Sequence, residues 1–339
     1  SQPYFYGRFK SSSVTSQSFI IGDTIKINKH WSIMGTLSWS WISQDSRKTT
    51  SVTNGVIPGA YVHSSANAAF SPTTSVIYKP TENQSLYFTY GRSVEAGPVS
   101  NASVANPYTA LPITHSEEYE VGYKIRYEKM QFNVSGFRMT SPYAANICAT
   151  SACTGKLTYG YGGTQRNYGV EAQISGEILP NLSVLAGMTW LDAELVNSNV
   201  TALVPGTNGK KTVSANGKEI VGVAPLQANL LLDYRLPASL GSFASGLAFN
   251  ANVHYMGNRA ADMSNTLHTG SYTTLDLGTR YAFHVVKFPW VVRFGVSNAT
   301  NERYWASVYT GSPGATSAAA ESLYAGLPRI YHFTLSMEF

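Results

Sequence analysis

The sequence predicts an all-β fold, specifically a transmembrane antiparallel β-barrel. Three observations support this: few charged residues, an apolar side chain at every second position of many segments, and connections that alternate between short and long. Charged residues make up 13% of the 339 residues and hydrophobic residues 43%, whereas soluble proteins are about 25% charged. This composition argues against a disordered chain or a charged coiled coil. The sequence contains no run of about 18 apolar residues, so a bundle of membrane helices is not expected either.

Apolar and polar side chains alternate in about thirteen segments. Near the middle of the chain, Tyr123 and Ile125 would take one face of a strand and Lys124 and Arg126 the other. Successive side chains of a strand project to opposite faces, so this alternation predicts strands with one apolar and one polar face. The clearest segments are 119–128, 170–178, 226–235, 247–255 and 331–339.

The connections between these segments fall into two classes. Very short ones occur at 28–30, 128–130 and 180–181. Long ones, rich in Gly, Ser, Asn and Ala, are expected at 45–67, 96–114, 144–160, 197–218 and 306–322. Tight turns at one end and long loops at the other are typical of outer-membrane barrels, whose turns are periplasmic.

A soluble β-sandwich or propeller is the alternative, since its strands also bury one face. Aromatic rings favour the membrane barrel because they gather towards segment ends, as at Trp39, Trp41, Tyr87 and Tyr90. Rings in such positions form girdles at the two membrane interfaces.

The number of segments predicts part of a larger barrel. Thirteen is odd, whereas single-chain bacterial barrels have an even number of strands. At about 26 residues per strand and connection, a barrel of about 22 strands would need about 570 residues. We therefore expect residues 1–339 to form one domain, the C-terminal portion of that barrel.

Several motifs carry a family resemblance, in the same order along the chain. They are Ser-Glu-Glu-Tyr-Glu-Val-Gly at 116–122, Val-Ser-Asn-Ala-Thr-Asn-Glu-Arg-Tyr at 296–304, and Gly-Leu-Pro-Arg at 326–329 before a last strand ending in Phe339. In these segments the chain resembles the TonB-dependent outer-membrane receptors, most closely the ferric-siderophore type. Residues 1–114 resemble the family only in their general pattern of strands and loops, without a specific motif.

The resemblance implies a receptor and transporter in the bacterial outer membrane that takes up a ferric siderophore with energy from TonB. The plug domain and the TonB-contacting region of such receptors are absent from this chain and are expected before Ser1. Iron would enter only within the siderophore, with no covalently bound cofactor. Further expected partners are outer-membrane lipid, lipopolysaccharide and the barrel-assembly machinery, which could recognise the terminal Phe339 by strand addition. Phe339 could equally be one more membrane-facing ring.

Two other functions remain open on the sequence alone. A passive porin or a secretion-type barrel would share the same strand pattern, and so would a structural scaffold for a surface partner. A nucleic-acid partner is not expected, because the basic residues are scattered although the formal net charge is +5, and phosphate binding needs basic residues grouped on one face.

Ligand contacts in a receptor of this kind would come from rings on the long loops and upper lumen, where amphipathic Tyr gives large contact area at low entropy cost. Some of these rings could instead only pack loops. Basic lumen residues could steer an anionic chelate or pair with acids on neighbouring strands. The ring candidates are Tyr61, Tyr108, Tyr143, Tyr159, Tyr161, Trp305, Tyr309 and Tyr324, the basic residues are Lys124, Arg126, Arg235 and Arg280, and the acids are Glu120, Glu171, Asp233 and Asp276.

The remaining chemistry-bearing residues predict no catalytic or metal site. Cys148 and Cys153 stand in a loop-like stretch of small polar residues, so a short-loop disulfide is favoured over two buried thiols. A zinc site would need two more ligands, and the seven His residues show no ligand spacing. No Gly-x-Ser-x-Gly nucleophile elbow occurs either, so we expect no enzyme.

Overall fold

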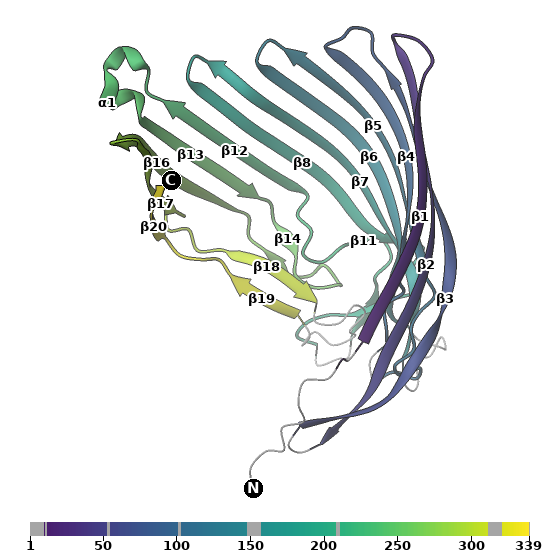
Figure 1. Cartoon of the computed structure of the whole chain (residues 1–339). Helices are drawn as coiled ribbons and strands as arrows, with labels where there is room; N and C mark the ends of the chain where they lie inside the picture. Colours follow the sequence, from purple (N-terminus) through teal and green to yellow (C-terminus); the bar gives the residue numbers. More distant parts are fainter. Residues whose placement is uncertain are drawn as a thin grey trace.

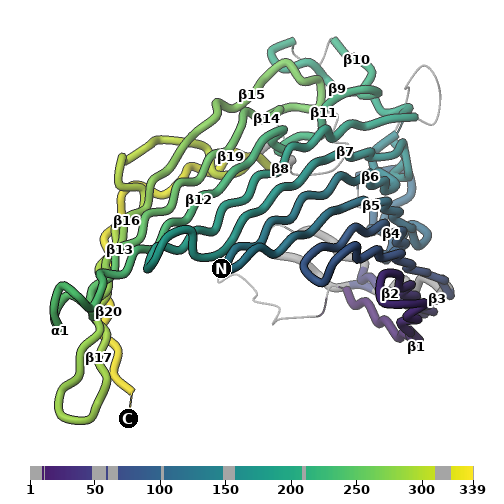
Figure 2. Tube along the Cα trace, turned by 90° about the horizontal axis from the view of Figure 1, so that it is seen from above, coloured from purple at the N-terminus to yellow at the C-terminus, as the bar shows by residue number. Residues whose placement is uncertain are grey.

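The fold is an antiparallel sheet that curves like part of a barrel wall (Figure 1). The computed structural model describes residues 10, 12–52, 55–100, 103–147, 157–207, 211–310 and 321–338. Seen from above, the strands lie side by side from β1 at one edge to β20 at the other (Figure 2). The path of the sheet is β1 (Ser12–Lys26), β2 (Trp31–Val52), β3 (Gly55–Tyr78), β4 (Gln84–Glu95), β5 (Thr114–Tyr127), β6 (Met130–Ile147), β7 (Thr158–Leu179), β8 (Leu182–Val196), β12 (Leu226–Arg235), β13 (Leu247–Met256), β16 (Tyr272–Val285), β17 (Phe288–Ser297) and β20 (Ile330–Met337).

This sheet confirms the predicted fold class and strand number. The sheet has 14 strands, of which β11 (Lys218–Glu219) lies off the path and pairs with β8, so 14 − 1 = 13 strands follow one another. Within the described residues, β1 and β20 each have one neighbour, so the sheet is open, as expected of a partial barrel.

The two ends of the sheet differ as predicted. At the turn end, tight connections follow β1, β5 and β7 at 27–30, 128–129 and 180–181. Asn181 has a φ of 66°, a left-handed conformation that Asn tolerates better than most residues. The connection from β12 to β13 holds a 3₁₀ turn, η1 (Ala238–Leu240), and a single helical turn, α1 (Ser242–Ser245). The opposite end, called the loop end below, carries the long connections (Figure 1).

Four of the predicted loops contain strand residues, which corrects those expectations. The loop expected at 45–67 is instead the continuation of β2 and β3, which pair as far as Val52 and Gly55. The loop at 197–218 contains the hairpin β9 (Thr201–Leu203) and β10 (Thr212–Ser214). The expected loops at 144–160 and 306–322 begin and end in strands, the first in β6 and β7 and the second in β18 (Trp305–Thr310) and β19 (Glu321–Ala325). Strands that extend beyond the bilayer need no apolar face, so alternation did not reveal them.

The sheet has one apolar and one polar face. Across β5, β6 and β7, Tyr123, Val134 and Ala172 lie opposite one another on the outer face. The adjacent row, on the other face, contains Lys124, Asn133 and Gln173, and this face is called the inner wall. The rows continue through β8 and β12, to Ala228 on the outer face and Asn229 on the inner wall.

One predicted girdle ring belongs to the inner wall. Tyr87 lies opposite Gly122, and a Cβ added to Gly122 would come within 2.3 Å of the Tyr87 ring. The missing side chain of Gly122 therefore lets the ring lie flat along the wall. The prediction that Tyr87 belongs to a membrane-facing girdle was wrong, because its strand neighbours Leu86 and Phe88 occupy the outer face and Tyr87 therefore projects to the inner wall.

The loop end has a small core of its own. Ala145, Leu195, Val200, Ala202 and Ala215 are buried together there. The core joins the ends of β6 and β8 to the β9–β10 hairpin, so these loops pack on one another instead of extending freely. No helix within the described ranges is long and apolar enough to cross a bilayer.

The assignment of the two faces predicts a large difference between neighbouring substitutions. Ala172 on the outer face and Gln173 on the inner wall lie in the half of β7 nearer the turn end. Ala172→Arg should lower the free energy of unfolding by about 2–4 kcal/mol, because it places a charge in hydrocarbon, whereas a change facing the lumen costs much less. Denaturant titration of the intact protein in lipid vesicles would measure both. Equal losses for Ala172→Arg and Gln173→Arg would contradict the assignment.

Candidate functional site

A hairpin at the loop end presents the most exposed candidate rings. Tyr309 lies opposite Ser322 and Tyr324 opposite Ser307, so the two rings share one face of the β18–β19 hairpin as diagonal neighbours. Their exposed fractions are 58% for Tyr309 and 60% for Tyr324, and Trp305 at the base of the hairpin is 44% exposed. Three of the eight predicted ring residues are therefore gathered on one element.

A buried arginine fixes the base of this hairpin. Arg259, in β14 (Arg259–Ala260), is only 3% exposed. Its guanidinium donates hydrogen bonds to the carbonyl oxygens of Trp305, at 2.5 Å, and Ala306, at 3.1 Å. Close by, the ring of Tyr304 stacks on that of Tyr272 with the centroids 4.1 Å apart. These contacts tie the β18–β19 hairpin to the β13–β16 connection.

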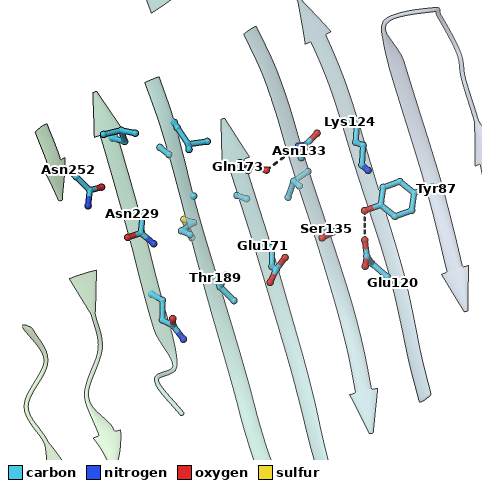
Figure 3. A pocket seen from close by; sticks show the side chains of 18 residues that line it. Tyr87, Glu120, Lys124, Asn133, Ser135, Glu171, Gln173, Thr189, Asn229 and Asn252 are labelled. Carbon is cyan, nitrogen blue, oxygen red and sulfur yellow. Dashed lines mark hydrogen bonds between the residues drawn. The ribbon is translucent and has the colours of Figure 1, made fainter. Parts of the chain in front are cut away.

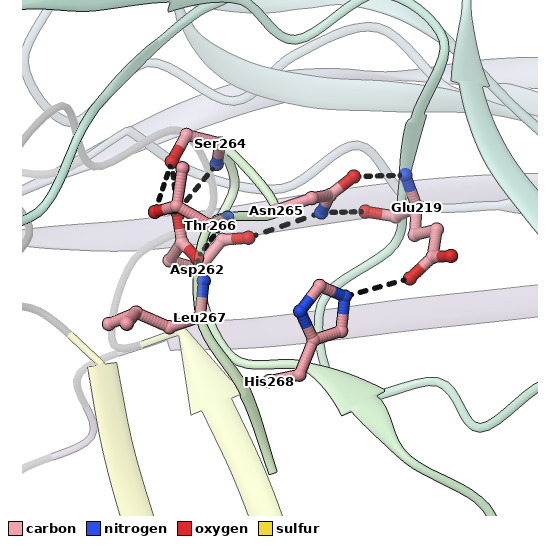
Figure 4. A network of polar contacts seen from close by, with 7 residues as sticks. All are labelled: Glu219, Asp262, Ser264, Asn265, Thr266, Leu267 and His268. Carbon is pink, nitrogen blue, oxygen red and sulfur yellow. Dashed lines mark hydrogen bonds and ion pairs between the residues drawn. The ribbon is translucent and has the colours of Figure 1, made fainter.

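A second network holds that connection in shape (Figure 4). Asp262, 1% exposed, accepts hydrogen bonds from the backbone N–H groups of Ser264, Thr266 and Leu267. Asn265 exchanges two hydrogen bonds with the backbone of Glu219 in β11, at 2.7 and 3.1 Å. A buried carboxylate is stable when its lone pairs are occupied in this way, so the loop has a defined conformation.

Three other predicted rings pack loops together. Tyr143 adjoins the loop-end core, and Tyr159 is buried with its backbone bound on both sides by the Asn106 side chain. The Tyr161 hydroxyl donates a hydrogen bond to the Pro112 carbonyl at 2.7 Å. Burial raises the pKa of Tyr143, Tyr159 and Tyr161, all of which lie beyond the membrane-crossing part of their strands. In this structure these three tyrosines are held by neighbouring loops.

The remaining predicted residues are less informative. Tyr108 lies half-buried in the 96–113 connection with a φ of 56°. Tyr61 falls within β3, but its side chain lies outside the described part. Cys148, Cys153 and Phe339 also lie outside the described residues, so the disulfide and the assembly signal stay predictions.

The inner wall carries a polar patch (Figure 3). Tyr87, Glu120, Lys124 and Glu171 line a hollow of about 580 Å³ that opens to the lumen. The Tyr87 hydroxyl donates a hydrogen bond to Glu120, and the Lys124 ammonium lies 4.9 Å from the centre of the Tyr87 ring. The patch therefore presents two carboxylates and one ammonium group to whatever occupies the lumen.

Of the expected lumen ion pairs, one is confirmed. Arg280 makes two hydrogen bonds to Asp233, at 2.5 and 2.9 Å. Lys124 lies over the Tyr87 ring and forms no ion pair with the residues that the structure describes. Within the described ranges Arg126 and Arg235 likewise form no ion pair.

Two expected acid partners are bound by neutral groups instead. Glu120 accepts from Tyr87, and Asp276 accepts from the backbone N–H of Asn298 at 2.8 Å. The prediction of arginine or lysine partners for them was wrong, because neutral donors on adjacent positions lie closer.

Nothing in the described part of the chain assembles a metal centre, since no three His, Cys, Asp or Glu residues converge. The arrangement offers exposed rings at the loop end and charged groups on the inner wall, which suit noncovalent recognition.

Sequence reasoning missed Arg259, Asp262 and the Tyr87–Glu120 pair. The spacing of Asp262, Ser264 and Thr266 is that of a side chain capping its own loop, and it could have indicated the second network. No local signal marks Arg259, whose partners are some 46 residues away in the sequence.

Comparison with known proteins assigns the chain to a family. A family model described as TonB dependent receptor-like, beta-barrel matches residues 1–299. The ferrichrome receptor FcuA of Yersinia enterocolitica is 30% identical over 277 residues, covering 79% of this chain and 32% of that protein. The probable TonB-dependent siderophore receptor PiuA of Acinetobacter baumannii is 24% identical over 319 residues, or 92% of this chain and 40% of that protein.

A solved structure shows the same fold. The crystal structure of BauA, the ferric preacinetobactin receptor of Acinetobacter baumannii, matches with a TM-score of 0.71 and 24% identity over 97% of this chain. The matched region is 43% of the BauA chain, so this chain spans about a third to two fifths of the proteins it resembles. The chain belongs to the TonB-dependent receptor β-barrel family of the bacterial outer membrane.

Proposed function

We propose that this chain forms part of the barrel wall and outer loops of a receptor that takes up a ferric siderophore with energy supplied through TonB. The observation that carries the proposal is the exposed pair Tyr309 and Tyr324, beside Trp305, on a hairpin fixed at the loop end. The similarity to a ferrichrome receptor supports this class of ligand. Flat amphipathic rings on a fixed hairpin provide contact area with little loss of entropy.

The polar inner wall suits a lumen that holds a plug domain and lets cargo pass. Glu120 and Glu171 face the hollow, where basic side chains of a plug domain would find ionic partners. Contact with TonB would be made by an N-terminal region that is not in this chain. The iron would remain within the siderophore and would need no protein ligand.

The proposal is tested with ferrichrome as the probe and the intact protein. We expect ferrichrome to quench tryptophan fluorescence in a saturable titration, and cells to accumulate radioactive iron from ferrichrome only when TonB is present. Binding of ferric preacinetobactin instead of ferrichrome would change the identity of the proposed ligand and would still support a siderophore receptor. Uptake independent of TonB, together with a steady conductance in planar bilayers, would indicate a passive pore and overturn the proposal.

The exposed ring pair should contribute directly to affinity. Replacing both Tyr309 and Tyr324 by Ala should weaken ferrichrome binding by about 2–3 kcal/mol, or roughly 30- to 150-fold, since aromatic side chains commonly dominate such surfaces. The matched control is Tyr127→Ala, which removes a ring that is 66% exposed at the turn end. Equal titration curves for the double variant and the control would argue against this site.

Arg259 should act through the hairpin that it holds. Arg259→Gln removes charge-assisted hydrogen bonds to two carbonyls, so local opening of the hairpin should become easier by about 2 kcal/mol. Faster amide hydrogen exchange at 305–310 and 321–325 would show this, with Arg259→Lys giving a smaller change. Arg303→Gln, which removes an exposed arginine from the β17–β20 connection that carries the hairpin, serves as the control. Unchanged exchange in Arg259→Gln would show that the arginine does not fix the hairpin.

A further inference from the structure

Three arginines lie on one row of the inner wall. Arg235 on β12 lies opposite Ala248 on β13, which in turn lies opposite Arg280 on β16. Arg280 lies opposite Arg293 on β17. The row faces the lumen, because Arg235 is six residues from the inner-wall residue Asn229 on the same strand. Like charges directly opposite one another destabilise a sheet, so this row needs negative charge beside it.

One carboxylate compensates one of these charges. The Arg280 guanidinium donates two hydrogen bonds to Asp233 on β12, at 2.5 and 2.9 Å. To reach Asp233 it crosses β13 at Ala248, which is buried, and so it extends away from β17. In the part of the chain that the structure describes, Arg293 forms no ion pair, and its recorded hydrogen bond is to the Ser336 hydroxyl at 3.3 Å. The charge of Arg293 is therefore left without a carboxylate among these residues.

Arg293 borders a recess in the inner wall. The recess has a volume of about 350 Å³ and is lined by residues of β13, β16, β17 and β20, which are neighbouring strands (Figure 1). Gly295 lies in it, and a Cβ added to this residue would have no neighbour closer than 3.8 Å. Gly278, opposite Gly295, leaves room for the Asn250 side chain. Two adjacent glycines therefore leave open space beside the Arg293 guanidinium.

Two further hydrogen-bonding side chains border the recess. His332 lies opposite Gly295, on β20, and its Nε2 is 3.0 Å from the Ser297 hydroxyl. Within the described residues the Nδ1 of His332 has no partner, so it remains available to a ligand. Thr334, opposite Arg293, adds a hydroxyl group. A guanidinium, an imidazole and a hydroxyl group around one space can together donate hydrogen bonds to an oxyanion.

The acid that lines the recess lies at its other end. Asp276 accepts hydrogen bonds at both carboxylate oxygens, from the backbone N–H of Asn298 at 2.8 Å and from the Asn252 side chain at 3.4 Å. On β16 it is four residues from Arg280, roughly 13 Å along a strand, and Arg280 is the residue opposite Arg293. An anion beside Arg293 is therefore well separated from this carboxylate, whose oxygens are already occupied.

We propose that this recess binds one small dissolved oxyanion, a phosphate or a carboxylate, with Arg293 as its main partner and His332 and Thr334 as further donors. A guanidinium suits this role, because it forms two parallel hydrogen bonds with a carboxylate or phosphate group. The anion also supplies the negative charge that the arginine row lacks. The recess lies on the inner wall, apart from the exposed rings of the β18–β19 hairpin. The site is therefore independent of siderophore binding and is tested without a siderophore.

The test follows the imidazole of His332 in the intact protein in detergent micelles, by nuclear magnetic resonance of carbon-labelled histidine rings. His332→Gln identifies the signal. Inorganic phosphate and citrate are titrated separately at constant ionic strength, and each should shift the His332 signal along a saturable curve. Arg293→Gln should weaken this binding about tenfold, the usual effect of losing a charge-assisted contact, and Arg293→Lys should restore part of it. Gly295→Val should weaken it by filling the recess while every charge stays in place.

The matched control is Arg126→Gln, which removes an inner-wall arginine on β5 that also forms no ion pair within the described ranges. Gel mobility of unheated samples verifies that each variant is a folded barrel. Equal affinities for Arg293→Gln and Arg126→Gln would overturn the site. A His332 signal that ignores both anions, or that moves without saturating, would overturn it as well, because the recess would then be filled by another part of the protein or would hold no anion. Neither result would bear on siderophore binding at the loop end.

Discussion

The structure depends on one constraint: a backbone in hydrocarbon must have all its polar groups paired. Each unpaired N–H or C=O there costs several kcal/mol, so a membrane strand needs a neighbour on both sides. β1 and β20 each have one neighbour within the described sheet, and exposed apolar residues such as Phe19 and Phe333 lie on them. A bilayer can therefore hold this sheet only when further strands pair with both edges.

The same strands separate two environments. Because side chains alternate, each residue step along β7 moves from lipid to lumen, as from Ala172 to Gln173. The outer face is thus available for lipid and the inner wall for cargo or plug, and a change to one need not disturb the other. Loops at one end add the third surface, whose shape is set by packing among the loops and not by the membrane.

Periodicity could predict the number of membrane strands and the position of the clearest ones, since about thirteen alternating segments match the thirteen strands of the sheet path. It failed where a strand leaves the bilayer, as in β2 and β3, because water accepts polar residues on both faces. For Tyr87 the girdle interpretation failed although periodicity did not, because alternation with Leu86 and Phe88 already places its side chain on the inner wall. At the candidate site, the position of a ring in a predicted loop was enough to name it as a candidate. Only the contacts in the structure show that Tyr159 packs loops together whereas Tyr309 is exposed on the β18–β19 hairpin.

The contacts of Arg259 explain how a loop can be both ordered and accessible. Burying a guanidinium costs free energy unless its donors are satisfied. Here the carbonyls of Trp305 and Ala306 accept hydrogen bonds from the two terminal nitrogens of Arg259, whereas its buried Nε has no partner. A carboxylate partner would fix only a side chain, whereas carbonyl acceptors fix the backbone of the hairpin itself. The rings of Tyr309 and Tyr324 can then stay in solvent while their position is already set, so a ligand that binds them orders little additional chain.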